Sequence, residues 1–213
     1  MTDDVRGFQD TIDWYDSSSE KYAENIESIP SISLIDKFVE VVSKGETVLD
    51  AGCAAGRDCR LLKDRGLKPV GLDLSKGLLE VARKKHPDIK FQYGNMLELP
   101  FENGSFGGVW AHASLLHFEK TKDVASALSE FNRVLKRDGV LHILVKEQKV
   151  PEKTSVVSDK VSGHKRFFQW FTRKEIETLL KNAGFSIIEI QDGYKDPAGR
   201  KEISWIYSLS KKL

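Results

Sequence analysis

The chain has 213 residues, of which 40% are hydrophobic and 31% are charged. These values are typical of a folded globular protein and exclude a fibrous or intrinsically disordered chain. The length fits one domain with at most a small appendage. The formal net charge is +1, from 33 basic and 32 acidic residues. Proteins whose main task is to grip a nucleic-acid backbone are usually far more basic, so this balance disfavours that class.

The ends and the cysteines indicate the compartment. The first residues contain no basic stretch followed by an apolar core, so no secretory signal is expected. No apolar run approaches the roughly 20 residues that cross a bilayer. The two cysteines, Cys53 and Cys59, favour reduced buried thiols over a disulfide. The histidines are too scattered for a metal site. We therefore expect a cytoplasmic protein without metal or membrane contact, either a monomer or a homodimer.

Hydrophobic patterns of helix and strand alternate along the chain. Residues 11–43 predict two helices separated at Pro30, and further helices are expected after the first strand, after Ser75, at 121–136 and at 172–183. Alternating strands and helices indicate βαβ units, so the expected fold is α/β, a doubly wound, mostly parallel sheet covered on both faces. The expected strands are residues 47–50, 69–72, 89–93, 107–111, 140–145, 185–190 and 203–209.

Residues 148–166 form a polar stretch without periodicity, which predicts a loop over the carboxyl edge of the sheet. Loops of this length are often functional lids, and an exposed connection is the alternative. Acidic residues predominate in residues 1–43 and basic residues in 146–213. This asymmetry indicates either two solvated faces of opposite charge or a basic rim beside a site for an anionic substrate.

A glycine-rich turn follows the first expected strand. Gly52 and Gly56 lie between this strand and the next helix, where glycine lets backbone approach a ligand and the helix start offers free N–H groups. Asp73 ends the second strand, and a carboxylate at this place can accept both hydroxyls of a ribose. Together the two features predict a nucleoside-binding site.

The same turn disfavours a dinucleotide. The NAD fingerprint G-x-G-x-x-G needs a middle glycine that clears room for a pyrophosphate. Here Ala54 takes the middle position, Arg57 replaces the third glycine, and Gly56 comes one residue too early. An NAD enzyme is therefore a distant alternative.

These motifs resemble those of the class I S-adenosylmethionine-dependent methyltransferases. Residues 48–57 (VLDAGCAAGR) are similar to the family's first motif, and residues 70–75 (VGLDLS) resemble its ribose-binding motif. Residues 93–101 resemble the adenine-contacting segment and residues 105–118 the fourth-strand motif, and the resemblance runs in order over 46–210. It implies S-adenosyl-L-methionine as cofactor, S-adenosyl-L-homocysteine as product, and a Rossmann-like sheet of seven strands whose last strand is antiparallel.

The resemblance also implies roles for individual residues. The glycine-rich turn would let backbone pass the methionine part of the cofactor, and Asp73 would hold the ribose. Arg57 would either neutralise the cofactor carboxylate or be a solvated residue at a helix start. Asn95 replaces a frequent acid, and its amide oxygen would accept from the adenine amino group. The candidate cofactor-binding residues are Asp50, Gly52, Ala54, Gly56, Arg57, Asp73, Leu74, Asn95, Met96, Ala111 and His112.

Residues 1–45 are expected to form helices that lie as a lid over the site, and residues 46–213 to form the compact methyltransferase domain. Tyr15 and Tyr22 resemble tyrosines that close over cofactor and substrate, with core-facing aromatics as the alternative. A substrate that is anionic or aromatic would suit the basic and aromatic residues after the polar stretch. The candidate substrate residues are Tyr15, Tyr22, Arg166, Phe168 and Trp170.

Methyl transfer from a sulfonium is an in-line displacement, so a protein mainly supplies alignment, exclusion of water and, for some acceptors, a base. No catalytic triad is visible. His112 and His117 follow the fourth strand and are the candidate catalytic bases, with packing roles as the alternative. Gly107 stands where the family frequently has an acid, which puts in doubt a mechanism that needs a carboxylate there.

The sequence thus predicts a methyltransferase that acts on a small-molecule acceptor. The alternative acceptor is a modified tRNA base, bound by the basic carboxyl-terminal part, although RNA is not favoured. A further alternative is a cofactor-binding accessory subunit without activity of its own, because an acid at position 107 and an obvious base are both missing.

Overall fold

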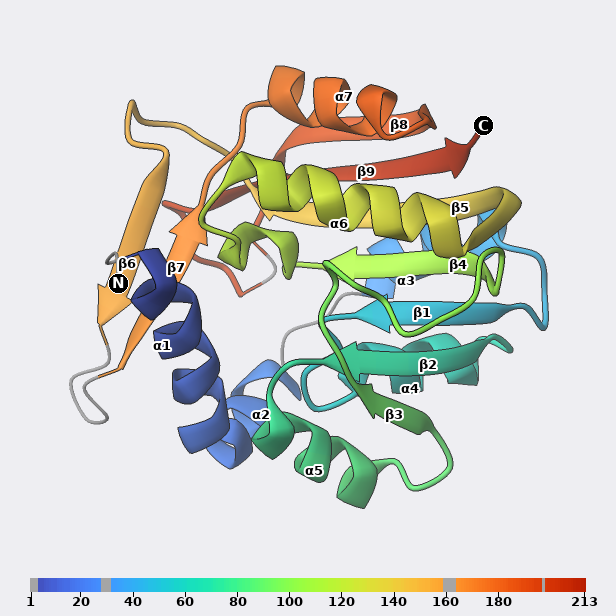
Figure 1. Ribbon diagram of the computed structural model, residues 1–213, viewed down its shortest axis with the longest axis horizontal. Coiled ribbons are helices and arrows are strands. Elements are labelled where there is room, and N and C mark those ends of the chain that lie inside the picture. The colour runs from blue at the N-terminus through green and yellow to red at the C-terminus, as the bar shows by residue number, and fades with distance from the viewer. Residues whose placement is uncertain (1–3, 28–31, 159–163, 197) are drawn as a thin grey trace.

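The computed structural model describes residues 4–27, 32–158, 164–196 and 198–213. Its main sheet contains β1 (Thr47–Ala51), β2 (Lys68–Asp73), β3 (Lys90–Tyr93), β4 (Phe106–His112), β5 (Leu135–Lys146), β8 (Phe185–Lys195) and β9 (Ser204–Lys212). These seven strands lie in the order β3-β2-β1-β4-β5-β9-β8 (Figure 1). The first five pair in parallel, and β9 runs antiparallel to both β5 and β8. The expected doubly wound sheet with an antiparallel last strand is confirmed.

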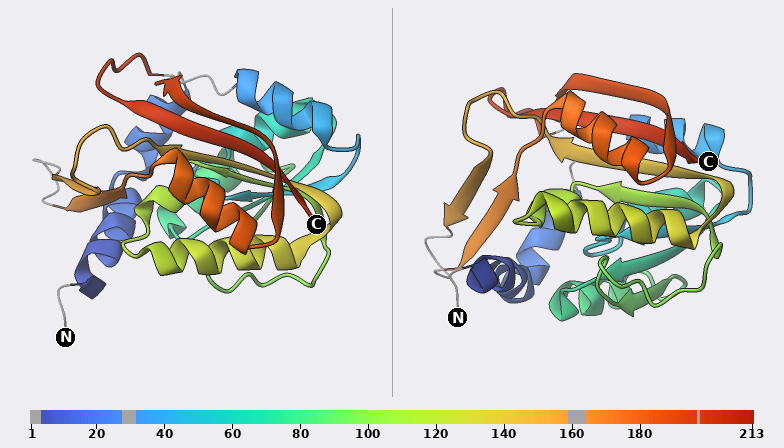
Figure 2. Two further views of the ribbon diagram at one scale, coloured as in Figure 1. Left: turned by 90° about the horizontal axis from the view of Figure 1, so that it is seen from above. Right: turned by 45° about the horizontal axis from the view of Figure 1, so that its top comes forward.

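Helices cover both faces of this sheet. The described helices are α1 (Asp4–Ser17), α2 (Ser19–Glu27), α3 (Ile32–Val41), α4 (Arg57–Asp64), α5 (Lys76–Lys85), α6 (Thr121–Val134) and α7 (Arg173–Asn182), with a 3-10 turn, η1 (Leu115–His117). Seen from above, α3 and α4 lie on one side of the sheet and α6 and α7 on the other (Figure 2). Side-chain caps confirm two expected helix starts: Ser75 Oγ accepts from Leu78 N, and Thr172 and Glu175 form a capping box.

The amino-terminal region contains three described helices where two were expected. The additional boundary lies at Ser18, and Ser17 Oγ donates to the carbonyl of Trp14 at 3.1 Å, competing with the helical backbone for that acceptor. The expected break at Pro30 lies outside the described residues. Of these three helices, α1 and α2 lie beyond the carboxyl ends of the parallel strands (Figure 1). α3 instead buries Phe38 against Trp110 of β4, with ring centroids 5.3 Å apart, and belongs to the core.

A second, two-stranded sheet occupies the region that was expected to be an unstructured loop. β6 (Thr154–Ser158) and β7 (Lys165–Gln169) pair antiparallel, so the expectation for residues 148–166 was wrong. The hairpin lies beside α1 (Figure 1), where the backbone N–H of Phe167 donates to Thr11 Oγ1 at 3.0 Å. A contact with the amino-terminal helix therefore supports this hairpin, and a local pattern could not reveal it.

Within the described residues, no helix is long and apolar enough to span a bilayer, and no group of three or more histidine, cysteine or acidic residues could hold a metal ion. The thiols of Cys53 and Cys59 are both buried and free, as expected. Burial raises the pKa of Cys53 to about 11, so this thiol stays protonated at neutral pH.

Candidate functional site

A cavity of about 410 Å³ lies at the carboxyl ends of the parallel strands. Residues that follow β1, β2 and β4 line one part of it, and α1, α2 and β7 line another. Open α/β sheets bind ligands at this edge, because the loops after neighbouring parallel strands converge there. The volume lies within the range of small-molecule pockets, roughly 300–1,000 Å³.

The turn after β1 has a left-handed backbone at three positions and borders the cavity. Gly52, Ala54 and Gly56 all have positive φ, of 82°, 48° and 81°. A Cβ on Gly52 would lie 2.5 Å from Cβ of Ser114, closer than such atoms approach. Only glycine therefore fits at position 52, and its bare backbone borders the cavity.

Asp73, at the end of β2, is held against this turn. Its Oδ2 accepts a hydrogen bond from Ala54 N at 2.9 Å, and its Oδ1 accepts one from Ser75 N at 2.8 Å. Burial raises the pKa of Asp73, and the hydrogen bonds from backbone N–H groups oppose this rise. Each carboxylate oxygen keeps one free lone pair, so the side chain can also accept hydrogen bonds from the hydroxyl groups of a ligand in the cavity.

Arg57 joins the site to the amino-terminal helices. Its Nε donates to Asp58 Oδ1 at 2.7 Å, and one terminal nitrogen donates to the carbonyl of Ile26 in α2 at 2.8 Å. Only 16% of the Arg57 side chain is exposed, so the alternative of a solvated residue at the helix start is wrong. Asp58 also accepts from Trp110 Nε1 at 2.9 Å. The charge of Arg57 is therefore already balanced inside the protein.

Asp50, at the end of β1, is a buried acid in the floor of the cavity. Burial and then the neighbouring charge of Asp58 raise the pKa of Asp50 well above its ordinary value. Cys59 Sγ donates to Asp50 Oδ2 at 3.2 Å. Two close buried carboxylates do not readily ionise together, so the paired Asp58 keeps the negative charge.

His112 ends β4 and belongs to a buried aromatic stack. Its ring lies parallel to that of Trp110, with centroids 5.1 Å apart, and its Nδ1 lies 3.3 Å from Nε2 of His142. Burial lowers the pKa of His112 to about 4 and that of His142 well below its ordinary value. Both rings are therefore neutral at pH 7, and His112 presents a neutral imidazole to the cavity.

His117 has a defined tautomer because both ring nitrogens have partners. Nδ1 lies 2.8 Å from the carbonyl oxygen of Phe167, so it carries the proton and donates it. Nε2 then accepts from the hydroxyl of Tyr15, 3.0 Å away. Burial lowers the pKa of His117 to about 4 and raises that of Tyr15. This neutral chain of hydrogen bonds connects α1, η1 and β7.

Comparison with known proteins identifies the family. A family model described as a methyltransferase domain matches residues 49–143, the part that contains the glycine-rich turn, Asp73 and His112. The chain belongs to the class I S-adenosylmethionine-dependent methyltransferases.

Individual relatives cover most of this methyltransferase. It is similar to O-methyltransferase cnsE of Penicillium expansum, with 28% identity over 209 residues, 90% of this chain and 70% of that protein. The demethylmenaquinone methyltransferase of Chlorobaculum tepidum is 33% identical over 165 residues, 67% of this chain and 66% of the relative. The 1,6-didemethyltoxoflavin-N1-methyltransferase of Burkholderia thailandensis, solved with its namesake ligand and S-adenosylhomocysteine, shares the fold. The two structures superimpose with a TM-score of 0.78 and 18% sequence identity, and the alignment covers 100% of this chain and 92% of the Burkholderia chain.

Most residues that the sequence singled out meet at the cavity of this methyltransferase. Three do not line it: Gly56 begins α4 against Phe91, Ala111 is fully buried in β4, and Trp170 donates to Ser155 Oγ in the hairpin. The expected residues that line the cavity are Tyr15, Tyr22, Asp50, Gly52, Ala54, Arg57, Asp73, Leu74, Asn95, Met96, His112, His117, Arg166 and Phe168.

Two departures from the family pattern have local explanations. Asn95 Oδ1 accepts from Leu97 N at 2.9 Å, so this side chain holds the turn after β3 and keeps one further lone pair. Gly107 lies near the amino end of β4, where an added Cβ would meet the carboxylate of Glu46. It is therefore remote from the cavity at the carboxyl ends, and an acid missing at position 107 removes nothing from the site.

Sequence reasoning missed other residues that line the cavity. Ala113 and Ser114 follow β4, Ala113 with a φ of 54° and Ser114 with a buried Oγ that has no partner among the described residues. Their position after a strand end is the same signal that identified Asp73 and could have found them. Lys146 ends β5, and Arg200 precedes β9. The long sequence separation of these two cations from the motifs hid them.

Proposed function

We propose that this protein binds S-adenosyl-L-methionine and transfers its methyl group to a small-molecule acceptor. The observation that carries the proposal is the contact between the ends of β1 and β2. Asp73 Oδ2 accepts from Ala54 N at 2.9 Å, so the carboxylate that would hold the ribose lies beside the glycine-rich turn. Both groups line one cavity, as a nucleoside with an attached amino acid requires.

Two observations support the fit of the cofactor to these residues. A Cβ on Gly52 would collide with Ser114, so the backbone of Gly52 stays bare where it borders the cavity and a ligand can approach it closely. The buried Ser114 Oγ beside it has no partner among the described residues, and a buried hydroxyl of this kind usually has one. A polar amino-acid group of the cofactor would satisfy it.

The residues of the chain then have distinct tasks. Asp73 would hold the ribose, and Leu74, Asn95 and Met96 would flank the adenine. The sulfonium supplies the activated methyl group, and the remaining task is to align the acceptor and exclude water. α1 and α2 form one side of the cavity and would act as the lid (Figure 1). His112 and His117 stay candidate bases, and their low pKa makes both weak bases at neutral pH.

A small acceptor is supported by the shape of the site. The two amino-terminal helices and the β6–β7 hairpin contribute residues to the same cavity of about 410 Å³, so their side chains limit the size of the acceptor. Similar proteins whose names specify O-methyltransferase activity favour acceptors that carry oxygen. A monomer or a homodimer in the cytoplasm stays our expectation.

Calorimetry tests the cofactor directly. We expect S-adenosyl-L-methionine and S-adenosyl-L-homocysteine to bind the purified full chain and NAD not to bind. Radiolabelled methyl donor, incubated with separate pools of small molecules and of tRNA, then identifies the acceptor class, with label expected in the small molecules. Binding of NAD alone would reject the proposal. Label in tRNA would favour the RNA alternative, and cofactor binding without transfer to any pool would favour an accessory subunit.

A further inference from the structure

Three cations from separate elements gather on the side of the cavity away from the glycine-rich turn. Lys146 ends β5, Arg166 lies in β7, and Arg200 lies in the segment before β9. Lys146 and Arg166 are within reach of the same aromatic ring, since Phe168 lies 3.7 Å from Lys146 Nζ and 5.6 Å from the Arg166 guanidinium carbon. Lys146, Arg166 and Arg200 therefore form one cationic cluster at the cavity.

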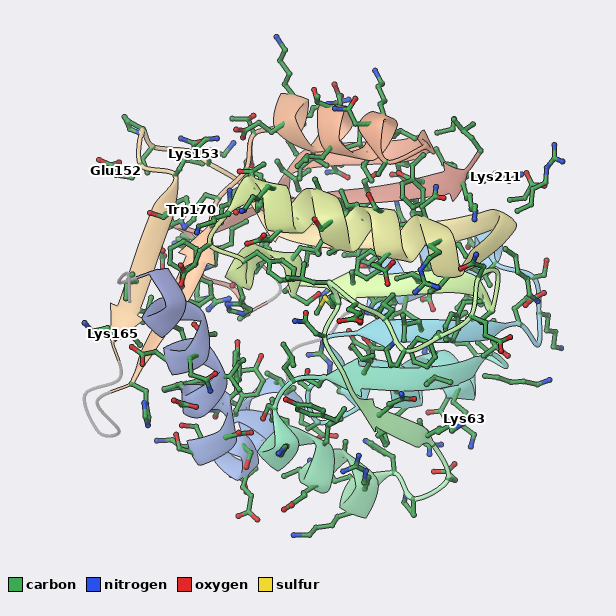
Figure 3. The ribbon with its side chains drawn as sticks, viewed as in Figure 1. Lys63, Glu152, Lys153, Lys165, Trp170 and Lys211 are labelled. Atoms are coloured by element: carbon green, nitrogen blue, oxygen red, sulfur yellow. The ribbon has the colours of Figure 1, made fainter. Side chains whose placement is uncertain are left out.

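Lys146 forms no salt bridge in the part of the chain that the structure describes, although the charge of Asp196 acts on it. Its recorded contacts are with the rings of Phe168, at 3.7 Å, and Trp170, at 5.9 Å (Figure 3 labels Trp170). Burial and then the charges of Arg200 and Arg166 lower the pKa of Lys146 to about 8, although the charge of Asp196 opposes this shift. A partly buried ammonium beside two guanidinium groups is an unfavourable arrangement unless an anion joins it.

Arg166 is also without a carboxylate partner among the described residues. Its guanidinium carbon lies 3.8 Å from the ring centroid of Trp14, a cation–π contact that holds the side chain at the cavity. Side chains alternate along a strand, so the neighbouring Lys165 faces the opposite way and points outward (Figure 3). The cavity thus receives the arginine of this strand and not the lysine.

Arg200 forms a salt bridge with Asp196, and both carboxylate oxygens of Asp196 accept hydrogen bonds. Asp196 Oδ1 accepts from Arg200 and from Trp205 Nε1, both at 2.8 Å, while Oδ2 accepts from the Arg200 backbone and Nε. Burial alone would raise the pKa of Asp196, but these hydrogen bonds lower it to about 2. One carboxylate therefore faces three cations, and the surplus is positive.

Apart from Asp196, which is bonded to Arg200, the acidic side chains that line the cavity lie at its other end and are engaged there. Asp58 pairs with Arg57, and Asp73 accepts from two backbone N–H groups. The cavity thus has an acidic end at the turn after β1 and a basic, aromatic end at β5 and β7. This separation of charge favours a cationic sulfonium on the acidic side of the cavity and an anionic ligand on the basic side.

We propose that the methyl acceptor carries an oxyanion, such as a carboxylate, on an aromatic or apolar body, and that Lys146 and Arg166 bind this oxyanion. Phe168 lines the cavity beside both cations and would contact the apolar body, Trp14 supports the Arg166 guanidinium, and Arg200, which also lines the cavity, is half exposed. This inference rests on the proposed function and adds the chemical class of the substrate. It also selects the basic rim beside an anionic substrate as the reason for the uneven charge of the sequence.

Matched acid and amide probes test the inference on the full chain loaded with S-adenosyl-L-homocysteine. The probes are benzoate and benzamide, phenylacetate and phenylacetamide, and indole-3-acetate and indole-3-acetamide, followed by calorimetry. We expect at least one acid to bind about ten-fold or more tightly than its amide, because hydrogen bonds between charged groups are stronger than those to a neutral amide. The variants K146M and R166Q should each lose most of this preference. The variant K165M removes the outward-facing lysine of the same strand and should keep it.

The outcomes separate the two proposals. If S-adenosyl-L-homocysteine does not bind the native chain, the proposed function fails. If it binds, and no acid is preferred over its amide or K146M and R166Q keep the preference, only the present inference is overturned. If K146M and R166Q weaken the binding of S-adenosyl-L-homocysteine itself, the cations serve the cofactor carboxylate, which also overturns the inference. Thermal unfolding of each variant checks that the fold is retained.

Discussion

The hydroxyl of Tyr15 in α1 lies 3.0 Å from Nε2 of His117, which follows β4 by five residues. The opposite nitrogen of the same ring donates to the carbonyl of Phe167 in β7. One neutral imidazole therefore fastens both an amino-terminal helix and the hairpin to the edge of the sheet. The two hydrogen bonds that hold α1 and the hairpin at the cavity therefore also engage both ring nitrogens of His117, the candidate base.

Removing the Tyr15 hydroxyl should weaken this connection. In Tyr15→Phe, Nε2 of His117 loses its donor, and a buried unsatisfied acceptor costs about 1–3 kcal/mol of unfolding free energy. Urea denaturation measures the loss. Tyr93→Phe is the matched control, because Tyr93 is 50% exposed and its change should leave stability within about 0.5 kcal/mol. Equal stability of both variants would refute the structural role of the Tyr15 hydroxyl.

The variant His117→Asn distinguishes positioning from base catalysis. Its amide nitrogen can take the place of Nδ1 and keep the bond to Phe167, but it is no base. Since the pKa of His117 is about 4, we expect kcat to fall by less than about ten-fold. A general base contributes about 10²- to 10⁴-fold, so a loss in that range would assign His117 the catalytic role. Steady-state kinetics with the identified acceptor measures the effect.

Gly52→Ala should abolish tight cofactor binding. The added Cβ meets Ser114 at 2.5 Å in a residue whose φ is 82°. Gly45→Ala is the matched control, because Gly45 has a φ of 80° and nothing within 4 Å of the added atom. Both variants should lose about 1–2 kcal/mol from the left-handed backbone. Only Gly52→Ala should also weaken S-adenosyl-L-homocysteine in calorimetry, and unchanged affinity would argue against a ligand at this turn.

Asp73→Asn should weaken the cofactor by about 100-fold, because hydrogen bonds from ribose hydroxyls to a carboxylate contribute about 1.5–3 kcal/mol each. The control Asp64→Asn changes a carboxylate that is 54% exposed on α4 and should bind the cofactor normally. Calorimetry with S-adenosyl-L-homocysteine provides the comparison. If both variants bind equally well, Asp73 does not contact the ribose.

The buried histidines should make stability depend on pH. Above pH 6.5 they are neutral in both the folded and the unfolded chain and contribute nothing. Below it the unfolded chain takes up protons that the folded chain does not, because burial lowers the pKa of His112 and His117 to about 4 and that of His142 well below its ordinary value. At pH 5 His112 and His117 therefore each cost about 2 kcal/mol of unfolding free energy, at about 1.4 kcal/mol per pKa unit.

The variant His142→Phe isolates this contribution. Burial raises the pKa of Asp50 and Asp73, so these two acids stabilise the fold as the pH falls, which opposes the effect of the histidines. The prediction is therefore the difference in stability loss between the variant and the native chain. Between pH 7.5 and pH 5, the variant should lose about 2 kcal/mol less than the native chain in urea denaturation. Equal losses would indicate that His142 takes up a proton in the folded state.

Local features of the chain were accessible from the sequence. The strand that ends at Asp73, the Ser75 cap and the capping box of Thr172 and Glu175 all depend on neighbours within a few residues. The glycine-rich turn was accessible for the same reason, since its residues adopt their left-handed backbone within a single bend. Parallel strands then bring their carboxyl ends to one edge, so the location of the site followed from the fold class.

Other features depend on contacts between distant segments. The β6–β7 hairpin has short strands, and it is stabilised by Thr11, 156 residues away in sequence from its partner Phe167. Lys146 reads in the sequence only as the polar end of an apolar strand. Its place beside Arg166 follows from where β7 lies.

The sequence by itself determined the sheet, the turn and the acid of the nucleoside site, because short-range hydrogen bonds and hydrophobic periodicity specify them. The tertiary structure alone decided which charges share the cavity. Electrostatic interactions act through space and not along the chain, so the pairing of Arg57 with Asp58 and the unpaired state of Lys146 among the described residues appear only once the segments are packed.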